Sequence, residues 1–522
     1  MENEDELDKD VRERIEREAA GKAPAPDAPP ITGKYIQDCL LSNSLGDGTL
    51  FATLMQGKFL FIKNFQEWYE WTGHCWQRDV MGGALAAVED VVQQYLGEYK
   101  RLSLEIVEMT AAGSTPESDG IKKIRTMQTN LLQRISQLRG DNRRTACLKF
   151  AHTNKRPLAI SGDQMDAKPW LFPCANGVIN LQKGTLRPGV QSDYLSLCSP
   201  VEFLGLEHPA PLWDETLLGI FDGNVELVAY LQRLLGYGLT GIVNEKIFPV
   251  FHGKTGWNGR TLLVETINFV MGKLAGSIPA EMLLSQRFVK SSSGPSPDIM
   301  SLKGIRLAFA SEIDEGQRFS ASMIKKLTGN DELVGRSPHD KYPTRFAPTH
   351  KLIVMTNTQP AAPAHDQAFW ERLQLIPFEI SFVNRDPQEP HERRANLNLG
   401  REILKEASGI LAWLVRGCLL WQIHGINPPL CIKEASKLYQ RNEDMMADFV
   451  DECVAREQAA RERAADLYAC FVKWYHENIG PKEPSGTWFG KTIRAKFEKI
   501  KSNGVVYYVG CRIKAEQGGT EG

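Results

Sequence analysis

Residues 248–271 read FPVFHGKTGWNGRTLLVETINFVM: a short apolar segment, a glycine-rich loop and a longer apolar segment. The first segment has the length and composition of a buried strand, and the second spaces its apolar residues as a helix does. Gly253, Gly256 and Gly259 permit a tight path between the two. The stretch therefore predicts the strand, loop and helix of a P-loop.

Backbone N–H groups of such a loop, with the start of the following helix, form an anion-binding concavity. ATP phosphates are expected to contact these loop residues: Gly253, Gly256, Asn258, Gly259, Arg260 and Thr261. The Thr261 hydroxyl is also expected to bind Mg²⁺, which accompanies the nucleotide.

Position 260 departs from the P-loop pattern, which has lysine where this chain has arginine. A guanidinium keeps the charge but is planar and bulkier, so it can hold phosphate while misplacing the transition state. A tolerated variant, a natural attenuation and a deliberate substitution all remain open explanations. Lys254 is either a substitute cation or an ordinary solvated loop residue.

Two later apolar segments, predicted as strands at 305–310 and 352–355, lead into polar residues. LAFASEID places Glu312, or else Asp314, where a carboxylate can hold Mg²⁺ and orient water. KLIVMTN ends on Asn357, which can sense the γ-phosphate. An acid after a strand is often only a turn or a helix cap, but glycine loop, acid and Asn in this order predict an ATPase core of the AAA+ kind.

Bulk composition fits an ordinary multidomain protein, with 522 residues, 42% of them hydrophobic, and a net charge of −2. No run of about 18 apolar residues is present, and the acidic start lacks the regions of a signal peptide, so a cytoplasmic location is expected. The ten cysteines are scattered singly and are expected to be reduced core residues.

Composition and pattern predict a multidomain α/β and α+β protein. A charged and Ala/Pro-rich tail (1–30) precedes a mainly helical α+β domain (31–215), with helix at 81–100 and aromatic strands at 67–79. The P-loop domain (216–427) alternates helices and strands, which favours a parallel sheet. Residues 428–515 read as helices followed by two short strands about a glycine turn within 504–513, a winged helix, and 516–522 form a second tail.

Two segments are rich in basic residues. Residues 122–156 hold ten Lys/Arg and one Asp on a helical pattern, which either lines a DNA channel or is a solvated face. Residues 482–514 interleave basic and aromatic residues. There a helix of about 488–501 is expected to enter a DNA groove through Lys491, Arg494 and Lys501, unless the module binds protein instead.

Four segments carry a family resemblance: LKGIRLAFASEIDEG (302–316), IKKLTGNDELVGR (324–336), FAPTHKLIVMTNTQP (346–360) and HDQAFWERLQLIPFEISF (365–382). They resemble the superfamily 3 helicase domain of phage and plasmid primase-helicases. Residues 169–188 and 230–241 resemble the helical domain that precedes it, shared with poxvirus primase-helicases, and residues 467–513 resemble its C-terminal winged helix.

The resemblance implies a ring, usually a hexamer, that binds ATP and Mg²⁺ between subunits and moves 3′ to 5′ on single-stranded DNA. It assigns Gly253, Gly259 and Thr261 to the phosphate loop, Glu312 to the Mg²⁺ site and Asn357 to the sensor. Arg372 would be the arginine finger of a neighbouring subunit, unless it only forms a surface ion pair with Glu371 or Asp366.

The same resemblance implies a DNA-gripping hairpin between residues 333 and 346, unless that segment is a solvated turn. The charges expected to meet DNA there are Arg336, His339, Lys341 and Arg345. Forked DNA, a separate primase or polymerase, and a bacterial or phage-infected cell are the implied partners and setting. The chain begins too late to hold the primase module that often precedes this domain, so no primer synthesis is expected.

Two functions therefore compete. One is an ATP-dependent helicase that replicates a phage, plasmid or integrated element, favoured by Glu312, Asn357 and Arg372. The other is a nucleotide-dependent DNA-binding ring or scaffold with slow hydrolysis, favoured by Arg260.

Overall fold

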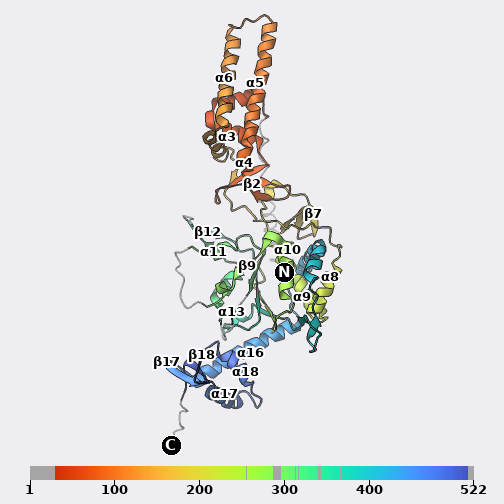
Figure 1. Ribbon diagram of the computed structural model, residues 1–522, viewed down its shortest axis with the longest axis vertical. Coiled ribbons are helices and arrows are strands. Elements are labelled where there is room, and N and C mark those ends of the chain that lie inside the picture. The colour runs from red at the N-terminus through yellow and green to blue at the C-terminus, as the bar shows by residue number, and fades with distance from the viewer. Residues whose placement is uncertain are drawn as a thin grey trace, which may run out of the picture. The chain divides into compact units, whose positions relative to one another are not determined.

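The structure is a computed structural model that describes residues 30–253, 255–285, 295–311, 313–314, 317–338, 342–363 and 366–514. The chain divides into two compact units, the first within 1–72 and 76–164 and the second within 73–75 and 165–522. The first includes an antiparallel pair of long helices, drawn in orange in Figure 1.

The first unit mixes helices with a small sheet, as the sequence predicts. Its helices are α2 (Gly33–Leu41), α3 (Asn43–Leu54), α4 (Gly83–Ala86), α5 (Val88–Ala111), α6 (Asp119–Leu138) and α7 (Asp141–Ala151). Its strands are β1 (Phe59–Ile62), β2 (Glu67–Trp71), β3 (Trp76–Arg78) and β4 (Ala159–Ile160), in the order β3–β2–β1–β4. The helix expected at 81–100 and the aromatic strands expected at 67–79 are confirmed.

A buried carboxylate joins its own helix to three other helices of this unit. Asp47 on α3 is fully buried and accepts hydrogen bonds from Tyr95 Oη (2.8 Å), Arg134 Nη1 (2.7 Å) and Arg143 Nε (2.8 Å). Arg134 is itself buried, so its charge is compensated inside the unit. These two arginines of the basic segment 122–156 therefore have a structural role.

Other cations of that segment differ in their surroundings. Arg139 and Arg144 approach the Glu89 carboxylate, at 2.9 and 4.0 Å. The exposed basic residues that remain are Lys122, Lys123, Arg125, Lys149, Lys155 and Arg156. These six, together with Arg139, whose ion pair is itself exposed, are available to a partner of the kind that the sequence suggests.

Asp47→Ala should destabilise the first unit, because it leaves Arg134 buried without its carboxylate. Deleting one member of a buried pair costs about 3–5 kcal/mol of unfolding free energy. Arg139→Ala is the matched control, since its pair with Glu89 is exposed to solvent and should contribute little to stability. Hydrogen exchange of peptides from α3 and α6 measures both; equal, small changes would contradict a stabilising role for Asp47.

A parallel five-stranded sheet organises the second unit, in the order β14–β8–β13–β10–β9. Its strands are β8 (Phe248–His252), β9 (Ala275–Pro279), β10 (Leu307–Ser311), β13 (Lys351–Thr356) and β14 (Leu373–Pro377). The predicted strands at 248–252, 305–310 and 352–355 are all present in it. Strand β13 lies between β8 and β10, so their carboxyl ends share one edge.

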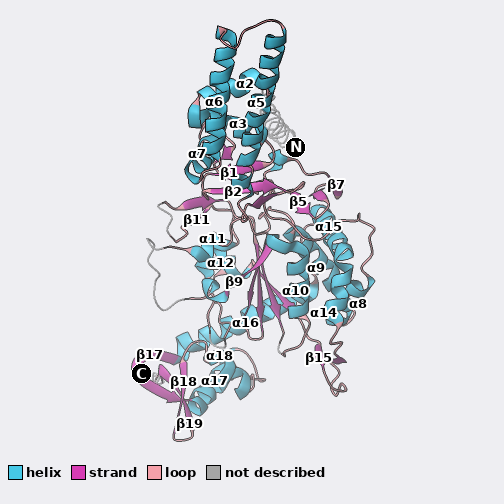
Figure 2. Ribbon diagram, turned by 45° about the horizontal axis from the view of Figure 1, so that its top comes forward, coloured by secondary structure: helices cyan, strands magenta, loops and turns pink. Residues whose placement is uncertain are grey.

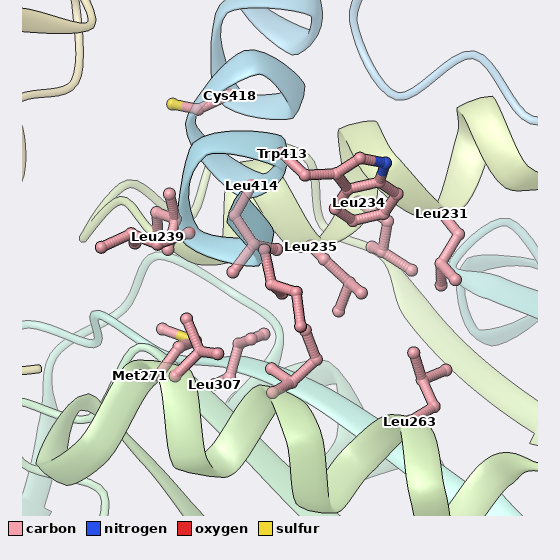
Figure 3. Close-up of a cluster of buried hydrophobic side chains, with 14 of the residues drawn as sticks. Leu231, Leu234, Leu235, Leu239, Leu263, Met271, Leu307, Trp413, Leu414 and Cys418 are labelled. Carbon is pink, nitrogen blue, oxygen red and sulfur yellow. The ribbon is translucent and has the colours of Figure 1, made fainter. Parts of the chain in front are cut away.

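Both faces of this sheet are buried, as expected of parallel strands that read as continuous apolar runs. Alternate residues pack against α9 (Val225–Gly238), α10 (Arg260–Met271) and α15 (Ala407–His424) on one face. Figure 3 shows leucines of α9 in the same core as Leu307 of β10 and Trp413 of α15. The other face packs against α12 (Ala321–Leu327), on the opposite side in Figure 2.

The predicted domain boundary at 215/216 differs from the structural division at 164/165. Between the two lie the antiparallel strands β5 (Leu171–Cys174), β6 (Gly177–Asn180) and β7 (Thr185–Arg187), and the start of α8 (Pro211–Ile220). Phe172, Ile179 and Trp213 are fully buried in the same core as α9 and α10. Burial against those helices joins this segment to the second unit.

Shorter elements surround the sheet. They are α11 (Pro297–Met300), β11 (Leu333–Gly335), β12 (Thr344–Phe346), α13 (Gln367–Trp370), β15 (Ser381–Val383), β16 (Glu392–Arg394) and α14 (Leu399–Ile403). Strands β11 and β12 pair antiparallel, with Leu333 opposite Phe346. The hairpin predicted between these two residues is therefore present.

The C-terminal module, residues 446–514, has its own core around Phe449, Phe471 and Phe489. Its elements are the end of α16 (Leu430–Cys453), β17 (Val454–Arg463), α17 (Ala464–Asn478), α18 (Gly486–Ile493), β18 (Glu498–Ser502) and β19 (Val505–Ile513). The strands form an antiparallel sheet in the order β17–β19–β18.

Two predictions about this module are wrong. The helix expected at 488–501 ends at Ile493, and residues 498–502 form β18. Residues 504–513 are not two short strands: β19 is one strand, and β18 reaches it through a turn at Asn503 and Gly504, both with positive φ (49° and 79°). Asn-Gly favours such a hairpin turn, so the glycine turn joins β18 to β19.

All ten cysteines are free thiols, most of them buried, as expected. Among the described residues, no helix has the length and apolar character needed to cross a bilayer.

Candidate nucleotide-binding site

The predicted loop lies between β8 and α10, where the sequence places it. Gly259 has φ of 84°, a conformation that favours glycine, and it precedes the helix directly. Arg260, Thr261 and Leu262 begin α10, so their N–H groups have no acceptors within the helix. Thr261 is exposed at this end. The loop and the helix start together can bind an anion.

Close packing beneath the loop depends on Gly253 and Asn258. Asn258 is buried, and its Nδ2 donates to the Thr255 carbonyl at 2.8 Å. A Cβ on Gly253 would lie 2.0 Å from that Nδ2 and 2.9 Å from the Phe378 carbonyl oxygen. Position 253 therefore requires glycine for space, whereas Gly256 has nothing within 4 Å of an added Cβ.

Arg260 is turned beneath the loop and is only 7% exposed. Its Nε donates to Asn258 Oδ1 at 2.8 Å, and its Nη1 donates to the Phe251 carbonyl at 3.1 Å. The guanidinium also donates to the Thr356 carbonyl and to Asn357 Oδ1. Burial lowers the pKa of Arg260, although an arginine keeps its charge at neutral pH.

These bonds join the predicted P-loop to the predicted sensor. Asn357 follows β13, whose last residue, Thr356, pairs with His252 at the end of β8. The structure thus brings Asn357 beside the loop, as predicted, and Arg260 holds its side chain there. In this arrangement the Arg260 guanidinium is bound to protein acceptors.

Of the two acids considered for the predicted site, the structure describes only Asp314. Glu312 lies outside the described residues, as do Lys254, His339 and Lys341. The strand before Glu312, β10, ends at Ser311 beside β13, with Ala310 opposite Val354. Asp314, the alternative acid, is exposed.

Arg372 lies at the end of the sheet opposite to the glycine loop, where the parallel strands begin. Leu373 pairs with Phe248, and Pro377 pairs with His252 at the loop end of β8. Arg372 is thus about 16 Å along the strand from its own P-loop, at about 3.3 Å per residue. Its Nη1 donates to the Ala368 carbonyl (2.6 Å), while its buried Nε has no hydrogen-bond partner among the described residues.

The ion pair considered for Arg372 is not formed with Asp366. The Asp366 carboxylate instead accepts from Lys325 Nζ at 2.7 Å. This contact is the main cause of the lowered pKa of Asp366, and the Phe369 N–H and the Lys325 and Arg372 charges lower it further, whereas burial opposes the shift.

The residues predicted to meet DNA lie in two places in the second unit. Arg336 follows β11 and Arg345 is exposed on β12. Lys491 is exposed on α18, Arg494 caps that helix, and Lys501 is exposed on β18 rather than on a helix. Neither group is part of the loop site.

Sequence reasoning missed the segment that supports the loop from below. Phe378 N–H donates to the His252 carbonyl at 2.7 Å, and Phe382 N–H donates to the Trp257 carbonyl at 2.7 Å. Ser381 Oγ and Thr255 Oγ1 share a hydrogen bond of 2.5 Å. No spacing pattern connects residues so far apart in the chain.

Helix α16 also contacts the chain that follows Asn357, which the sequence did not reveal. Tyr439 Oη donates to the Pro360 carbonyl, and Glu443 accepts from the Ala362 N–H at 3.1 Å. Burial raises the pKa of Glu443 even though Lys496 Nζ lies 3.7 Å away. One helix therefore links the segment after Asn357 to the C-terminal module.

In the described part of the chain, no three His, Cys, Asp or Glu side chains gather as a metal-binding group.

Gly253→Ala should weaken binding of a fluorescent ATP analogue, because the added methyl must displace Asn258 or the chain at Phe378. Overpacking of this kind costs about 1–3 kcal/mol. Gly256→Ala is the matched control and should bind almost as the native chain does. Fluorescence titration measures binding, and thermal melting checks folding. Equal affinities of the two variants would contradict the packing role of Gly253.

Comparison with known proteins gives both a domain match and relatives. Residues 48–222 match the family model described as D5 N terminal like. The chain is 24% identical over 460 residues to Putative helicase L207/L206 of Acanthamoeba polyphaga mimivirus, covering 83% of this chain and 46% of that protein. It is 24% identical over 397 residues to Putative helicase 022R of Frog virus 3 (isolate Goorha), covering 62% and 40%.

The chain thus spans less than half the length of these curated relatives. A solved apo structure of the NrS-1 C-terminal region is 12% identical, with a TM-score of 0.42 over 90% of this chain and 99% of that one. Residues 48–222 are therefore similar to the D5 N-terminal-like family, and over most of its length the chain is similar to viral proteins named as putative helicases.

Proposed function

We propose that this chain is an ATP-dependent DNA helicase that acts in replication of a virus, phage, plasmid or integrated element. The observation that carries the proposal is the meeting of the glycine loop and Asn357 at adjacent strand ends, in a chain whose relatives are named as helicases. The strand order, with β13 between β8 and β10, supports the AAA+ assignment. The element order of residues 430–513 supports the winged helix.

The residues act on ATP in distinct ways. N–H groups of the loop and of the first turn of α10 hold the phosphates, and Thr261 would bind the Mg²⁺ that the nucleotide brings. That ion would neutralise charge on the transferring phosphoryl group. Asn357 orients toward the γ-phosphate, and Glu312 is the proposed acid that positions the attacking water. Water then cleaves the β–γ bond, giving ADP and phosphate.

The distant position of Arg372 supports a ring, usually a hexamer. An arginine about 16 Å along the sheet from its own loop cannot reach the nucleotide bound there. A neighbouring subunit can present the same residue to that nucleotide, where it would stabilise charge as a finger. The hairpin β11–β12, with Arg336 and Arg345, would then meet single-stranded DNA inside the ring, and translocation would run 3′ to 5′.

A second candidate function rests on Arg260. Its guanidinium is bound by Asn258, Phe251, Thr356 and Asn357, so phosphate must compete with these acceptors. Slow hydrolysis would follow if that competition fails. The chain would then serve as a nucleotide-dependent DNA-binding ring or scaffold, for example one that recruits a primase or polymerase.

Steady-state ATP hydrolysis with and without single-stranded DNA separates the two. We expect the native chain to hydrolyse ATP faster when DNA is present, and Thr261→Ala to lose about tenfold or more because Mg²⁺ loses its hydroxyl ligand. Arg260→Lys is measured beside it. Turnover only in Arg260→Lys would favour the scaffold, and no turnover in either protein would overturn the helicase proposal.

Mixed rings test the finger. Arg372→Ala should still bind ATP but hydrolyse it about 10³-fold more slowly. Mixing it with Thr261→Ala should restore part of the activity, because one subunit supplies the intact loop and its neighbour supplies the arginine. Lys325→Ala, on the same side of the sheet, is the control for a general loss of structure. Failure of every mixing ratio to exceed the separate variants would count against a shared site.

A further inference from the structure

The three-stranded sheet of the C-terminal module has one face turned away from the helices. Figure 2 shows α17 and α18 beside this sheet. Tyr508 and Cys511 of the central strand β19 are buried in the module core with residues of these helices. Because neighbours in a strand point to opposite faces, Tyr507 and Val509 lie on the other face. This open face is defined by Val505, Tyr507 and Val509 of β19 and the residues that pair with them.

Arginines of β17 flank the aromatic centre of the open face. Arg463 pairs with Tyr507 and Arg461 pairs with Val509 in the antiparallel register. The Arg461 guanidinium lies 4.7 Å from the centroid of the Tyr507 ring. Both arginines are exposed, and within the described residues neither pairs with a carboxylate.

Acidic residues do not cancel this charge. Glu462 lies on the opposite face, where it accepts from the Ile513 N–H at 3.3 Å. Glu498, opposite Val509, is the carboxylate at the far edge of the open face. Glu457 lies 3.6 Å from Arg512, and both side chains are at least half exposed.

A half-buried aromatic ring between exposed arginines suits a strand of nucleic acid whose bases are unpaired. Bases stack on aromatic rings whatever their sequence, and arginines meet the phosphates that follow. A duplex offers its bases only at groove edges, which a flat sheet face cannot enter without distortion. The chemistry of the open face therefore matches single-stranded DNA.

The helix predicted to enter a DNA groove, α18, has fewer exposed groups that could contact DNA. α18 is an eight-residue helix that buries Phe489 and Ile493. Of the predicted contact residues, Lys491 alone is exposed on it, because Arg494 caps the helix and Lys501 lies on β18. One exposed cation gives little hold on a phosphate backbone.

We propose that the open face of the β17–β19–β18 sheet binds single-stranded DNA, with Tyr507 stacking on a base and Arg461 and Arg463 contacting phosphates. The proposal rests on the proposed function in that DNA is the substrate of the chain. It assigns the C-terminal module to holding an unpaired strand rather than to reading a duplex groove.

Fluorescence anisotropy without nucleotide tests it, using the full chain, a labelled 20-nucleotide thymidine strand and a labelled duplex of equal length. Tyr507→Ala should weaken binding of the single strand about tenfold or more, whereas Tyr507→Phe should retain it. The double variant Arg461→Ala/Arg463→Ala should reduce the slope of log affinity against log salt by about 1.4, since two phosphate contacts are lost. Thermal melting verifies that each exposed-site variant folds.

Lys491→Ala on α18 is the matched control and should leave single-strand affinity almost unchanged. A large loss in Lys491→Ala with none in Tyr507→Ala would assign binding to the helix and overturn the proposal. Tighter binding of the duplex than of the single strand, or equal affinities of Tyr507→Ala and the native chain, would also overturn it.

DNA-independent ATP hydrolysis separates this outcome from the fate of the proposed function. Tyr507→Ala should keep the basal rate, because Tyr507 is not part of the nucleotide site. If the native chain hydrolyses no ATP, and Tyr507→Ala binds the single strand more weakly than the native chain does, the helicase proposal is rejected. The proposal that the open face binds single-stranded DNA is then retained. If the native chain hydrolyses ATP and Tyr507→Ala binds DNA with unchanged affinity, the helicase proposal is retained and the open-face proposal is rejected.

Discussion

The buried guanidinium of Arg260 is the interaction on which the candidate site depends. It lies where the ends of β8 and β13 meet, and it binds the carbonyls of both strands together with Asn258 and Asn357. A charge removed from water must keep its hydrogen bonds, so these acceptors hold the loop and the sensor in one arrangement. A lysine, with a single nitrogen, could not bind all four groups in this fork-like geometry.

The sequence was most informative where local pattern and tertiary structure agree. The strand, loop and helix at 248–271, the strands before Glu312 and Asn357 and the hairpin at 333–346 follow from apolar runs bounded by glycine or polar residues. The C-terminal module shows the limit. Residues 455–463, AREQAARER, have high helix propensity yet form most of β17, because pairing with β19 outweighs propensity. Asn503-Gly504 did carry a hairpin signal that could have placed β18.

Contacts between distant parts of the chain could not be predicted. The support of Thr255 and Trp257 by residues 381–382 uses backbone groups and hydroxyls that carry no sequence pattern. The position of Arg372 depends on the order of β14 and β8 in the sheet, which apolar periodicity does not specify. Burial of residues 171–213 beside α9 likewise reflects packing between surfaces rather than a local signal.

Helix α16 gives the molecule a mechanical property that its separate parts lack. It is 24 residues long, about 36 Å at 1.5 Å per residue. Its middle is fixed to β14 through Ser436 and to the chain after Asn357 through Tyr439 and Glu443, and its end lies in the core of the C-terminal module. The ten residues that follow Glu443 therefore act as a lever about 15 Å long: a tilt of about 10° at Glu443 would carry the far end of the helix about 3 Å. On the proposed function, a small movement of the chain after Asn357 would shift a DNA strand held on the module by a similar distance.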